Sequence, residues 1–237
     1  METPSHSSTT LSPNVTAATE GMGLRERKKL RTRKTIERVA LDLFAERGFH
    51  ATTLTQIAEA AEVAPSTLHA YFPSKDDVVF DTLDAACESA RERVVARPAE
   101  QTAVAALQSW VSAELPLISD ANPVLAQLRR TIIDSDQALL AQERLRHALL
   151  EDILAEAFAR DLGESSDDLR SRLMGAVALN ALRVVWAWWY RNLTDNAGDA
   201  REALALDMSY VTSLLDAAAH AIEAIPSPQD HLRLRAL

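Results

Sequence analysis

The sequence predicts an all-α fold, with a small N-terminal helix-turn-helix domain followed by a larger C-terminal helical domain. Apolar residues recur at helical spacing along most of the 237 residues, and no stretch alternates as a half-buried strand does. Only six glycines are present, which is too few for a turn-rich β fold. The expected divisions are a tail at 1–23, an N-terminal domain at 24–75, a C-terminal domain at 76–226 and a tail at 227–237.

The first third of the chain combines a polar tail with a basic segment. Residues 1–23 are rich in Ser, Thr and Pro and carry few large apolar groups, so we expect them to be disordered. Residues 25–75 hold ten Lys or Arg and six Asp or Glu, although the whole chain has a net charge of −9. The basic run consists of Arg25, Arg27, Lys28, Lys29, Arg31, Arg33 and Lys34. This asymmetry suggests a polyanion partner at one end of the molecule. The alternative is that this basic run is only a solvated helix start or a flexible arm and binds no partner.

Three short helical patterns fill the basic segment. The apolar positions of the first are Ile36, Val39, Ala40, Leu43 and Phe44. Gly48 is placed to end this helix in the left-handed conformation. The second helix begins with a capping box at Thr53–Gln56, the third begins at Pro65, and Ser74 caps a fourth. Two short helices joined by a tight turn form a helix-turn-helix, whose second helix enters the major groove of DNA. The alternative is an αα-hairpin with no role in DNA binding.

The rest of the chain is predicted to form long helices that end at proline or glycine. Two apolar seams repeat with a period of 3.5 residues, which is typical of packing between helices. The first seam is Met174, Ala178, Ala181, Val185 and Trp188, and the second is Leu204, Met208, Val211, Leu215, Ala218 and Ile222. The two helices are expected to pair with their counterparts in a second chain and form a homodimer. The alternative is that both seams lie in the core of one chain.

Several other function classes are excluded by the sequence. A single cysteine, Cys87, leaves no internal disulfide and suggests a reducing cytoplasm; we expect it to be a small core residue rather than a redox switch. No secretory signal precedes the helices, and the most apolar stretch, 174–190, is short for a membrane span and contains Asn180 and Arg183. There is no glycine-rich phosphate loop, no HExxH motif and no plausible Ser/His/Asp set. We therefore expect no catalytic residues, no cofactor, no metal and no membrane partner.

The chain resembles the TetR/AcrR family of transcriptional regulators over about residues 32–79. The resemblance rests on the ordered segments 41–49 (LDLFAERGF), Thr52-Thr53, Ile57-Ala58 and 67–75 (TLHAYFPSK). It implies a helix-turn-helix that binds double-stranded DNA. This sequence has Ala64 where the family usually has Ser, His69 where it often has Tyr, and Thr55 where it often has Arg, so the operator of a relative does not transfer. A looser resemblance over 168–189 is to actinobacterial members with a hydrophobic effector pocket, some of them associated with acyl-CoA-type ligands.

The DNA contacts are expected from the third helix and its neighbours. Side chains at the start of a recognition helix point at base edges. Those expected to contact bases are Pro65, Ser66, His69 and Ala70, and those expected to contact phosphates are Thr53, Thr67, Tyr71 and Lys75. The alternative for His69 is a surface histidine with no part in specificity. Lys75 also lies at a helix N-terminus, where free amides favour an anion.

The effector contacts are expected from tryptophans and from polar residues in apolar surroundings. The candidates are Trp110, His147, Asn180, Arg183 and Trp186, each of which has an ordinary core role as its alternative. The sequence thus predicts a cytoplasmic homodimeric repressor that binds a palindromic operator and is released by a small apolar or amphipathic effector. Alternatives are a regulator or activator without an effector and, more remotely, an all-α enzyme or lipid carrier.

Overall fold

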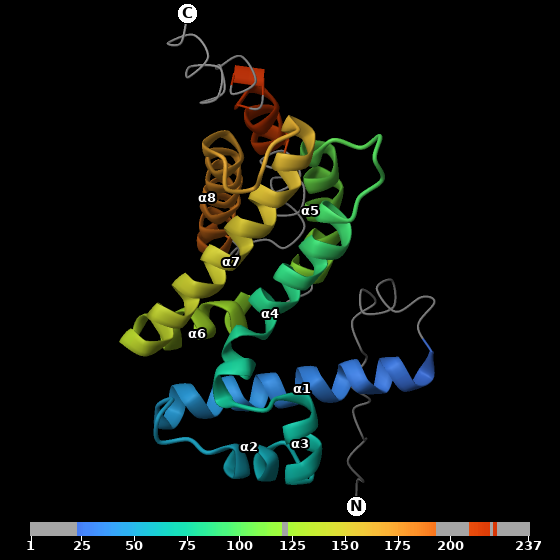
Figure 1. Cartoon of the computed structure of the whole chain (residues 1–237). Helices are drawn as coiled ribbons and strands as arrows, with labels where there is room; N and C mark the ends of the chain where they lie inside the picture. The colour runs from blue at the N-terminus through green and yellow to red at the C-terminus, as the bar shows by residue number, and fades with distance from the viewer. Residues whose placement is uncertain (1–22, 120–122, 193–208, 219, 222–237) are drawn as a thin grey trace, which may run out of the picture.

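The computed structural model describes residues 23–119, 123–192, 209–218 and 220–221, and these residues confirm the expected all-α fold (Figure 1). The helices are α1 (Leu24–Arg47), α2 (Leu54–Ala60), α3 (Pro65–Tyr71), α4 (Lys75–Ala90), the π-helical turn η3 (Arg91–Val95), α5 (Ala103–Ser119), α6 (Pro123–Asp134), α7 (Gln137–Leu162) and α8 (Leu169–Asn192). Residues 209–218 form a further helix. Apart from Gly23, the two expected tails lie outside the described residues.

Local signals in the sequence place the first helices as expected. The Thr53 hydroxyl accepts a hydrogen bond from the Gln56 amide, and Gln56 Oε1 accepts one from the Thr53 amide at 2.8 Å, which completes the capping box. Pro65 stands in the first turn of α3, and Ser74 caps α4. The expectation for Gly48 was wrong in detail. Its φ of 88° and ψ of 150° lie outside the left-handed helical region, in a conformation that only glycine adopts readily.

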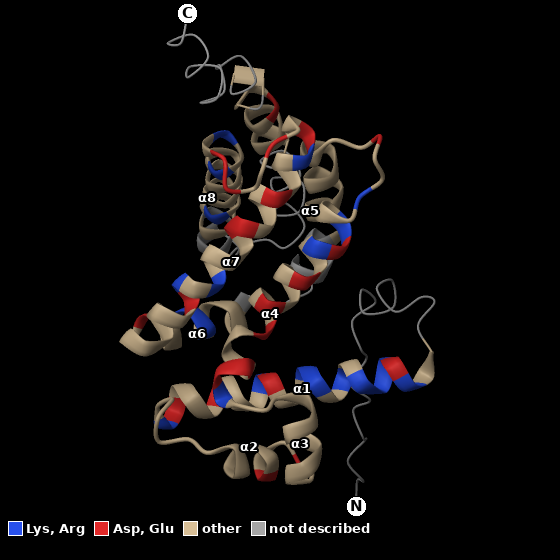
Figure 2. Cartoon of the chain, in the orientation of Figure 1, with Lys and Arg blue, Asp and Glu red and all other residues tan. Residues whose placement is uncertain are grey.

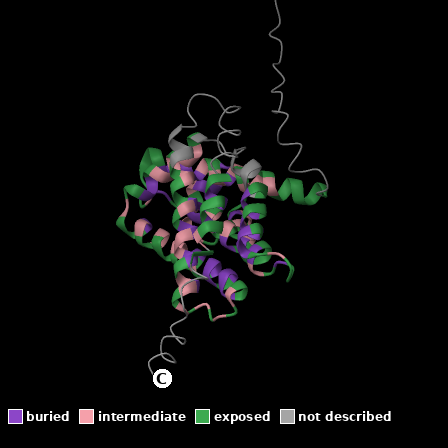
Figure 3. Ribbon diagram, turned by 90° about the horizontal axis from the view of Figure 1, so that it is seen from above, coloured by how far each residue is buried: buried purple, intermediate pink, exposed green. Residues whose placement is uncertain are grey.

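Two hydrophobic clusters divide the buried residues. The N-terminal cluster is formed by α1, α2, α3 and the first turns of α4, and is completed from far along the chain by Ile132, Ile133 and Leu139. The C-terminal cluster is formed by the rest of α4 with η3, α5, α7, α8 and the helix at 209–218. Figure 3 shows the buried residues along the inner sides of these helices. The α4 helix is therefore part of both clusters, and its residues connect them.

The helices α7 and α8 approach each other closely at Gly175. A Cβ atom at this position would lie 2.7 Å from the Glu151 carbonyl oxygen and 2.8 Å from the Ala155 amide nitrogen, and both of these are backbone atoms. Only a residue without a side chain fits such a contact. Gly175 therefore fixes how α7 and α8 lie against each other.

Two arginines fasten the end of α4 to α7. Arg97 is buried, forms an ion pair with Asp161 and donates hydrogen bonds to the carbonyl oxygens of Val94 and Ala157. Arg160 donates to the carbonyl oxygens of Val95 and Arg97. A π-helical turn and the loop after it leave carbonyl groups that the helix does not pair, and these guanidinium groups satisfy them.

The described parts of the two apolar seams lie inside one chain, so assigning them to a dimer interface was wrong. Met174, Ala178, Val211 and Leu215 are all buried in the C-terminal cluster, and Leu204, Met208 and Ile222 lie outside the described residues. The exposed apolar residues of these helices form a different row, which consists of Leu169, Leu173 and Val184 on α8 with Tyr210 and Leu214. A helical period shows that a helix packs on something, but it does not show whether the neighbour belongs to the same chain.

Among the described residues, no helix has the length and apolar character needed to cross a membrane. The same residues include no group of three or more His, Cys, Asp or Glu side chains arranged to hold a metal ion. Cys87 is buried in the C-terminal cluster, and this burial raises the pKa of its thiol. A buried thiol of this kind stays protonated and behaves as a small apolar residue.

Candidate nucleic-acid interface

The helix-turn-helix is held together by a small apolar core. Ile57 and Ala58 of α2 and Leu68 of α3 are fully or almost fully buried against Phe44 of α1. The turn between α2 and α3 passes through Glu62, whose φ of 55° is positive. An L residue in this conformation is strained, and a turn this tight is what sets two short helices at an angle. The core therefore presents one side of α3 to solvent.

The exposed side of α3 carries the residues expected to contact bases. Pro65, Ser66, His69 and Ala70 are all exposed, whereas Leu68 between them is buried. Thr67 and Tyr71, expected at phosphates, are half-buried. The exposed group thus offers a hydroxyl, an imidazole and a methyl group on one short helix, which are side chains suited to base edges in a major groove. These roles remain predictions.

Thr53 and Lys75 have structural partners as well as expected phosphate contacts. The Thr53 hydroxyl is engaged in the capping box of α2. Lys75 Nζ donates a hydrogen bond to the Phe49 carbonyl oxygen at 2.7 Å and lies 4.6 Å from the centre of the Phe49 ring. Lys75 thereby ties the start of α4 to the loop after α1. An ammonium group has three donors, so this contact leaves two for a phosphate.

The N-terminus of α4 offers fewer free amides than the sequence suggested. The Ser74 amide donates to Asp77 Oδ2 at 2.7 Å, and the Asp77 amide donates to the Ser74 hydroxyl at 3.2 Å. The capping box thus uses two of the amides that would otherwise attract an anion. Any phosphate contact near this helix end depends on the Lys75 ammonium more than on backbone amides.

An arginine connects the start of α4 with α1 and α3. Arg33 forms an ion pair with Asp81 and donates a hydrogen bond to the Tyr71 carbonyl oxygen at 3.3 Å. Its guanidinium also lies 4.5 Å from the centre of the Phe72 ring. Hydrogen bonding to Asp81 raises the pKa of Arg33, which therefore stays charged. One side chain thus holds the end of α3 against α4.

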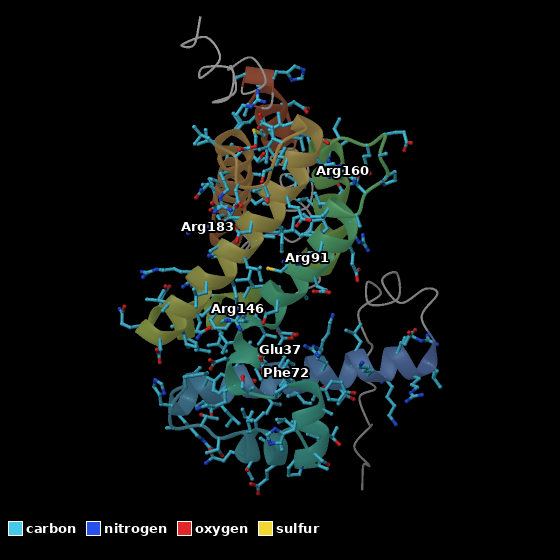
Figure 4. The ribbon with its side chains drawn as sticks, in the orientation of Figure 1. Glu37, Phe72, Arg91, Arg146, Arg160 and Arg183 are labelled. Atoms are coloured by element: carbon cyan, nitrogen blue, oxygen red, sulfur yellow. The ribbon has the colours of Figure 1, made fainter. Side chains whose placement is uncertain are left out.

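The α6 and α7 helices contact α1 and α4 through further charged pairs. Arg129 of α6 forms an ion pair with Glu37 of α1, and both side chains are largely buried. Burial raises the pKa of Glu37, although the charge of Arg129 opposes this. Arg146 of α7 contacts Asp84 at 2.8 Å and lies 4.2 Å from the centre of the Phe80 ring (Figure 4). These pairs join residues 62 or more positions apart, so no local pattern in the sequence indicates them.

A histidine forms a similar link at the loop after α1. His50 Nε2 lies 2.6 Å from Oδ2 of Asp136, the residue that caps α7. Hydrogen bonds from the Leu139 and Ala138 amides lower the pKa of Asp136, which is therefore ionised at neutral pH. The start of α7 is thus held at the loop after α1 by a charged group.

The five residues expected to contact an effector are distributed over three helices. Trp110 of α5 is buried, and its Nε1 donates to the Ser89 hydroxyl at 3.1 Å. Trp186 of α8 packs partly buried on the same C-terminal cluster. Asn180 and Arg183 are exposed, and Asn180 Nδ2 donates to the Ala176 carbonyl oxygen. Asn180 and Arg183 thus lie on a face of α8 that is open to solvent in the single chain.

His147 and Arg183 are the two effector candidates that the fold brings into electrostatic range. His147 is half-buried on α7. Burial lowers the pKa of its imidazole, and the charges of Arg183 and Arg130 lower it further against the opposing effect of Glu143. The imidazole is therefore neutral at pH 7 and provides one hydrogen-bond donor and one acceptor.

Comparisons with known proteins agree with this arrangement. A family model for bacterial regulatory proteins of the tetR family matches residues 36–82. The transcriptional regulator TcmR of Streptomyces glaucescens is 33% identical over 190 residues, covering 78% of this chain and 84% of that protein. RutR of Escherichia coli K12 is 46% identical over 59 residues, which are 25% of this chain and 28% of that protein. A crystal structure of a transcriptional regulator from Pseudomonas aeruginosa PAO1 has the same fold, with a TM-score of 0.53 at 15% identity over 86% of this chain and 97% of that one. The match to TcmR extends well beyond the helix-turn-helix, and the chain therefore belongs to the TetR family of DNA-binding transcriptional regulators.

Proposed function

We propose that this regulator is a cytoplasmic repressor that binds a palindromic operator as a homodimer and is released by a small effector. The observation that carries this proposal is the position of α4. Its first turns, with Val78, Val79 and Phe80, belong to the N-terminal cluster, and Cys87 and Ala90 near its other end belong to the C-terminal cluster. A change in the packing of the C-terminal cluster therefore acts directly on a helix that supports α3.

A second copy of the chain is the proposed partner for the exposed apolar row on α8. Leu169, Leu173 and Val184 are 61%, 44% and 67% exposed in the single chain, and Tyr210 and Leu214 are exposed on the next helix. Exposed apolar rows of this kind mark association surfaces. An isologous pair would place two α3 helices symmetrically, which suits a palindrome. Asn180 falls in the same helical row, so we assign it to this face rather than to the effector.

The proposed effector is an apolar or amphipathic molecule with one acidic or carbonyl group. Trp110 is buried in the C-terminal cluster and Trp186 packs against it, among residues that are almost all apolar. The neutral imidazole of His147 and the guanidinium of Arg183 are the polar groups available nearby. A charge-assisted hydrogen bond to such a group contributes about 1.5–3 kcal/mol. Fatty or aromatic acids and their thioesters therefore rank above sugars and metal ions.

The operator experiment separates the two kinds of expected DNA contact. Mapping bound DNA across the genome gives the operator, and titrations then compare Ser66→Ala and His69→Ala with Lys75→Ala. The first two changes should relax specificity at one or two positions by about 1–3 kcal/mol. Lys75→Ala should weaken binding to all duplexes and lower the salt slope by about one unit per protomer. Lys75→Arg is the matched control that keeps the charge. An unchanged salt slope in Lys75→Ala would remove Lys75 from the phosphate contacts.

The dimer experiment uses the exposed row, because Val211 lies in the core of one chain and a charge there would simply unfold the protein. Leu173→Glu places a carboxylate in the proposed dry interface, which should separate the dimer and abolish tight operator binding. Val124→Glu is the control, since Val124 is 68% exposed on α6, away from the row. Sedimentation velocity measures both. A dimer that survives Leu173→Glu would show that the interface lies elsewhere.

The effector experiment distinguishes a ligand-responsive repressor from a regulator without an effector. A panel of apolar and amphipathic acids and thioesters is screened for a rise in melting temperature and for release of the operator. Arg183→Gln should weaken any acidic hit while leaving operator affinity unchanged. If only hydrophilic compounds bind, the proposed chemistry of the effector is wrong. A protein that binds the operator but responds to no compound in either class fits an effector-independent regulator, and increased transcription from the bound promoter would identify an activator.

A further inference from the structure

The N-terminal half of α1 extends beyond the DNA-binding domain. The first buried residue of this helix is Ile36, and the family model also begins at residue 36. Residues 24–35 therefore form twelve helical residues ahead of the shared domain, and at 1.5 Å per residue they reach about 18 Å. Figures 1 and 3 both show this end of α1 projecting past the rest of the molecule.

This projecting segment is strongly basic. Residues 24–35 contain seven Lys or Arg and one acidic residue, so their net charge is +6 (Figure 2). Arg33 is already engaged with Asp81 and Phe72. The other six are exposed, and none forms an ion pair or a side-chain hydrogen bond with another described residue; they are Arg25, Arg27, Lys28, Lys29, Arg31 and Lys34.

The cations of this segment repel one another along the helix. Arg25 and Lys29, and Arg27 and Arg31, are like-charged pairs four residues apart, and such pairs destabilise a helix that has no counter-charge. Glu26 is the one acidic residue of the segment, and its carboxylate accepts a hydrogen bond from the Gly23 amide at the helix start. A phosphate beside these cations would reduce the repulsion between them.

One row of cations faces the same way as the packed side of α1. Arg25 and Lys29 lie at helical spacing from Ile36, Ala40 and Leu43, which are buried against the DNA-binding core. The row that contacts the core in the second half of the helix thus carries positive charge in the first half. In Figure 1 the second half of α1 lies over α2 and α3, and its charged first half extends beyond them.

We propose that residues 24–35 are a second DNA-binding element, which contacts the phosphates of base pairs flanking each half-site. This inference rests on operator binding by α3. At 3.4 Å per base pair, an 18 Å helix spans about five base pairs. Contacts to phosphates carry no sequence information, so the element adds affinity and footprint length without adding specificity.

Charge-neutral variants of the full chain test this proposal. Arg25→Gln/Lys28→Gln/Lys29→Gln should lower the salt slope of operator binding by about two to three units per protomer, because each lost phosphate contact removes about 0.9. Hydroxyl-radical protection should shorten by several base pairs on each flank. Trimming the flanks of the duplex should weaken the wild type but leave this variant unaffected. Arg27→Gln/Arg31→Gln/Lys34→Gln is the matched control with the same change of charge on the opposite row, and its effect should be smaller.

The outcomes separate this inference from the proposed function. Wild-type protein that binds no specific duplex would contradict the operator proposal itself. Specific binding with the same salt slope, footprint and dependence on flanking length in wild type and triple variant would overturn only the role of residues 24–35. Loss of binding to phosphatidylglycerol vesicles, with DNA binding unchanged, would overturn it in favour of a membrane surface.

Discussion

The two hydrophobic clusters are joined to their neighbours by different kinds of contact. Where the N-terminal cluster meets α6 and α7, the contacts include ion pairs, such as Glu37 with Arg129 and His50 with Asp136. In the C-terminal cluster, α7 and α8 are also linked by the ion pair of Arg172 with Asp152, but at Gly175 the two helices touch through their backbones. Ion pairs require particular partners and a particular distance, whereas a backbone contact requires only that nothing larger stands there. The first kind of contact is therefore sensitive to pH and to small movements, and the second holds two helices as one body.

Breaking the ion pair between α1 and α6 should give the largest effect. Arg129→Met leaves the Glu37 carboxylate largely buried without its counter-charge, which should cost about 3 kcal/mol of unfolding free energy. Denaturant unfolding measures the loss. The double variant Arg129→Met/Glu37→Gln removes the uncompensated charge and should recover most of the stability. Equal stability of the single and double variants would show that the buried charge is not the cause.

The same variant should also be sensitive to pH. Because burial raises the folded-state pKa of Glu37 above its ordinary value of 4.5, its contribution to stability is fully present below that value. The contribution is lost as pH rises through the folded-state pKa. Without Arg129 the pKa rises further, so Arg129→Met should lose more stability relative to wild type at pH 7 than at pH 5. If the free energy of unfolding changes with pH in the same way in wild type and Arg129→Met, the pKa of Glu37 does not depend on Arg129.

Adding one methyl group at Gly175 should give an intermediate effect in the other cluster. Gly175→Ala forces α7 and α8 apart and should cost about 1–3 kcal/mol, although alanine favours a helix. For a chain of this length each kcal/mol lowers the melting temperature by about 2–4 °C. Gly23→Ala is the control, since its new Cβ would meet nothing closer than 3.8 Å. If Gly175→Ala melts at or above the wild-type temperature, the helices are free to separate.

Relieving the strained turn of the helix-turn-helix should give the smallest effect. Glu62 has a φ of 55°, which glycine adopts without strain. Glu62→Gly should therefore be neutral or stabilising by up to about 1 kcal/mol, because relief of strain offsets the greater freedom of the unfolded chain. Ala60→Gly, in the exposed last turn of α2, should instead destabilise by about 1 kcal/mol. Chemical unfolding of both variants tests whether the two changes differ in sign.

What could be predicted from the sequence follows the range of the interactions involved. The capping boxes at Thr53 and Ser74 and the proline at Pro65 act within three residues, so the helix-turn-helix was predictable almost residue by residue. The exposed base-contact candidates on α3 follow from the same local pattern. The Glu37–Arg129 pair joins residues 92 positions apart and depends on how α6 packs, which no local pattern encodes.

In the C-terminal half, the neighbours of each helix also depend on residues that are distant in the sequence. Periodicity identified the apolar seams of α8 and of the last helix, but Met174 and Val211 are buried within one chain and the exposed row is offset from them. The π-helical turn after Ala90 was not predicted. Its Val95 carbonyl is paired by Arg160, which lies 65 positions further along the chain, and no local pattern indicates that contact.

Because η3 is bound to α7, the end of α4 next to η3 is a fixed point about which α4 can tilt. Arg97 and Arg160 hold that end in place. Any tilt of α4 therefore displaces its opposite end, where Ser74 and Lys75 follow α3 in the chain. Sixteen residues at 1.5 Å each make an arm of about 24 Å, so a tilt of about 5° moves the far end by about 2 Å. A displacement of that size exceeds the tolerance of a hydrogen bond to a base edge. A rearrangement of the C-terminal cluster that tilts α4 by so small an angle would leave the fold unchanged and still move the start of α4, next to α3 in the chain, by more than such a bond tolerates.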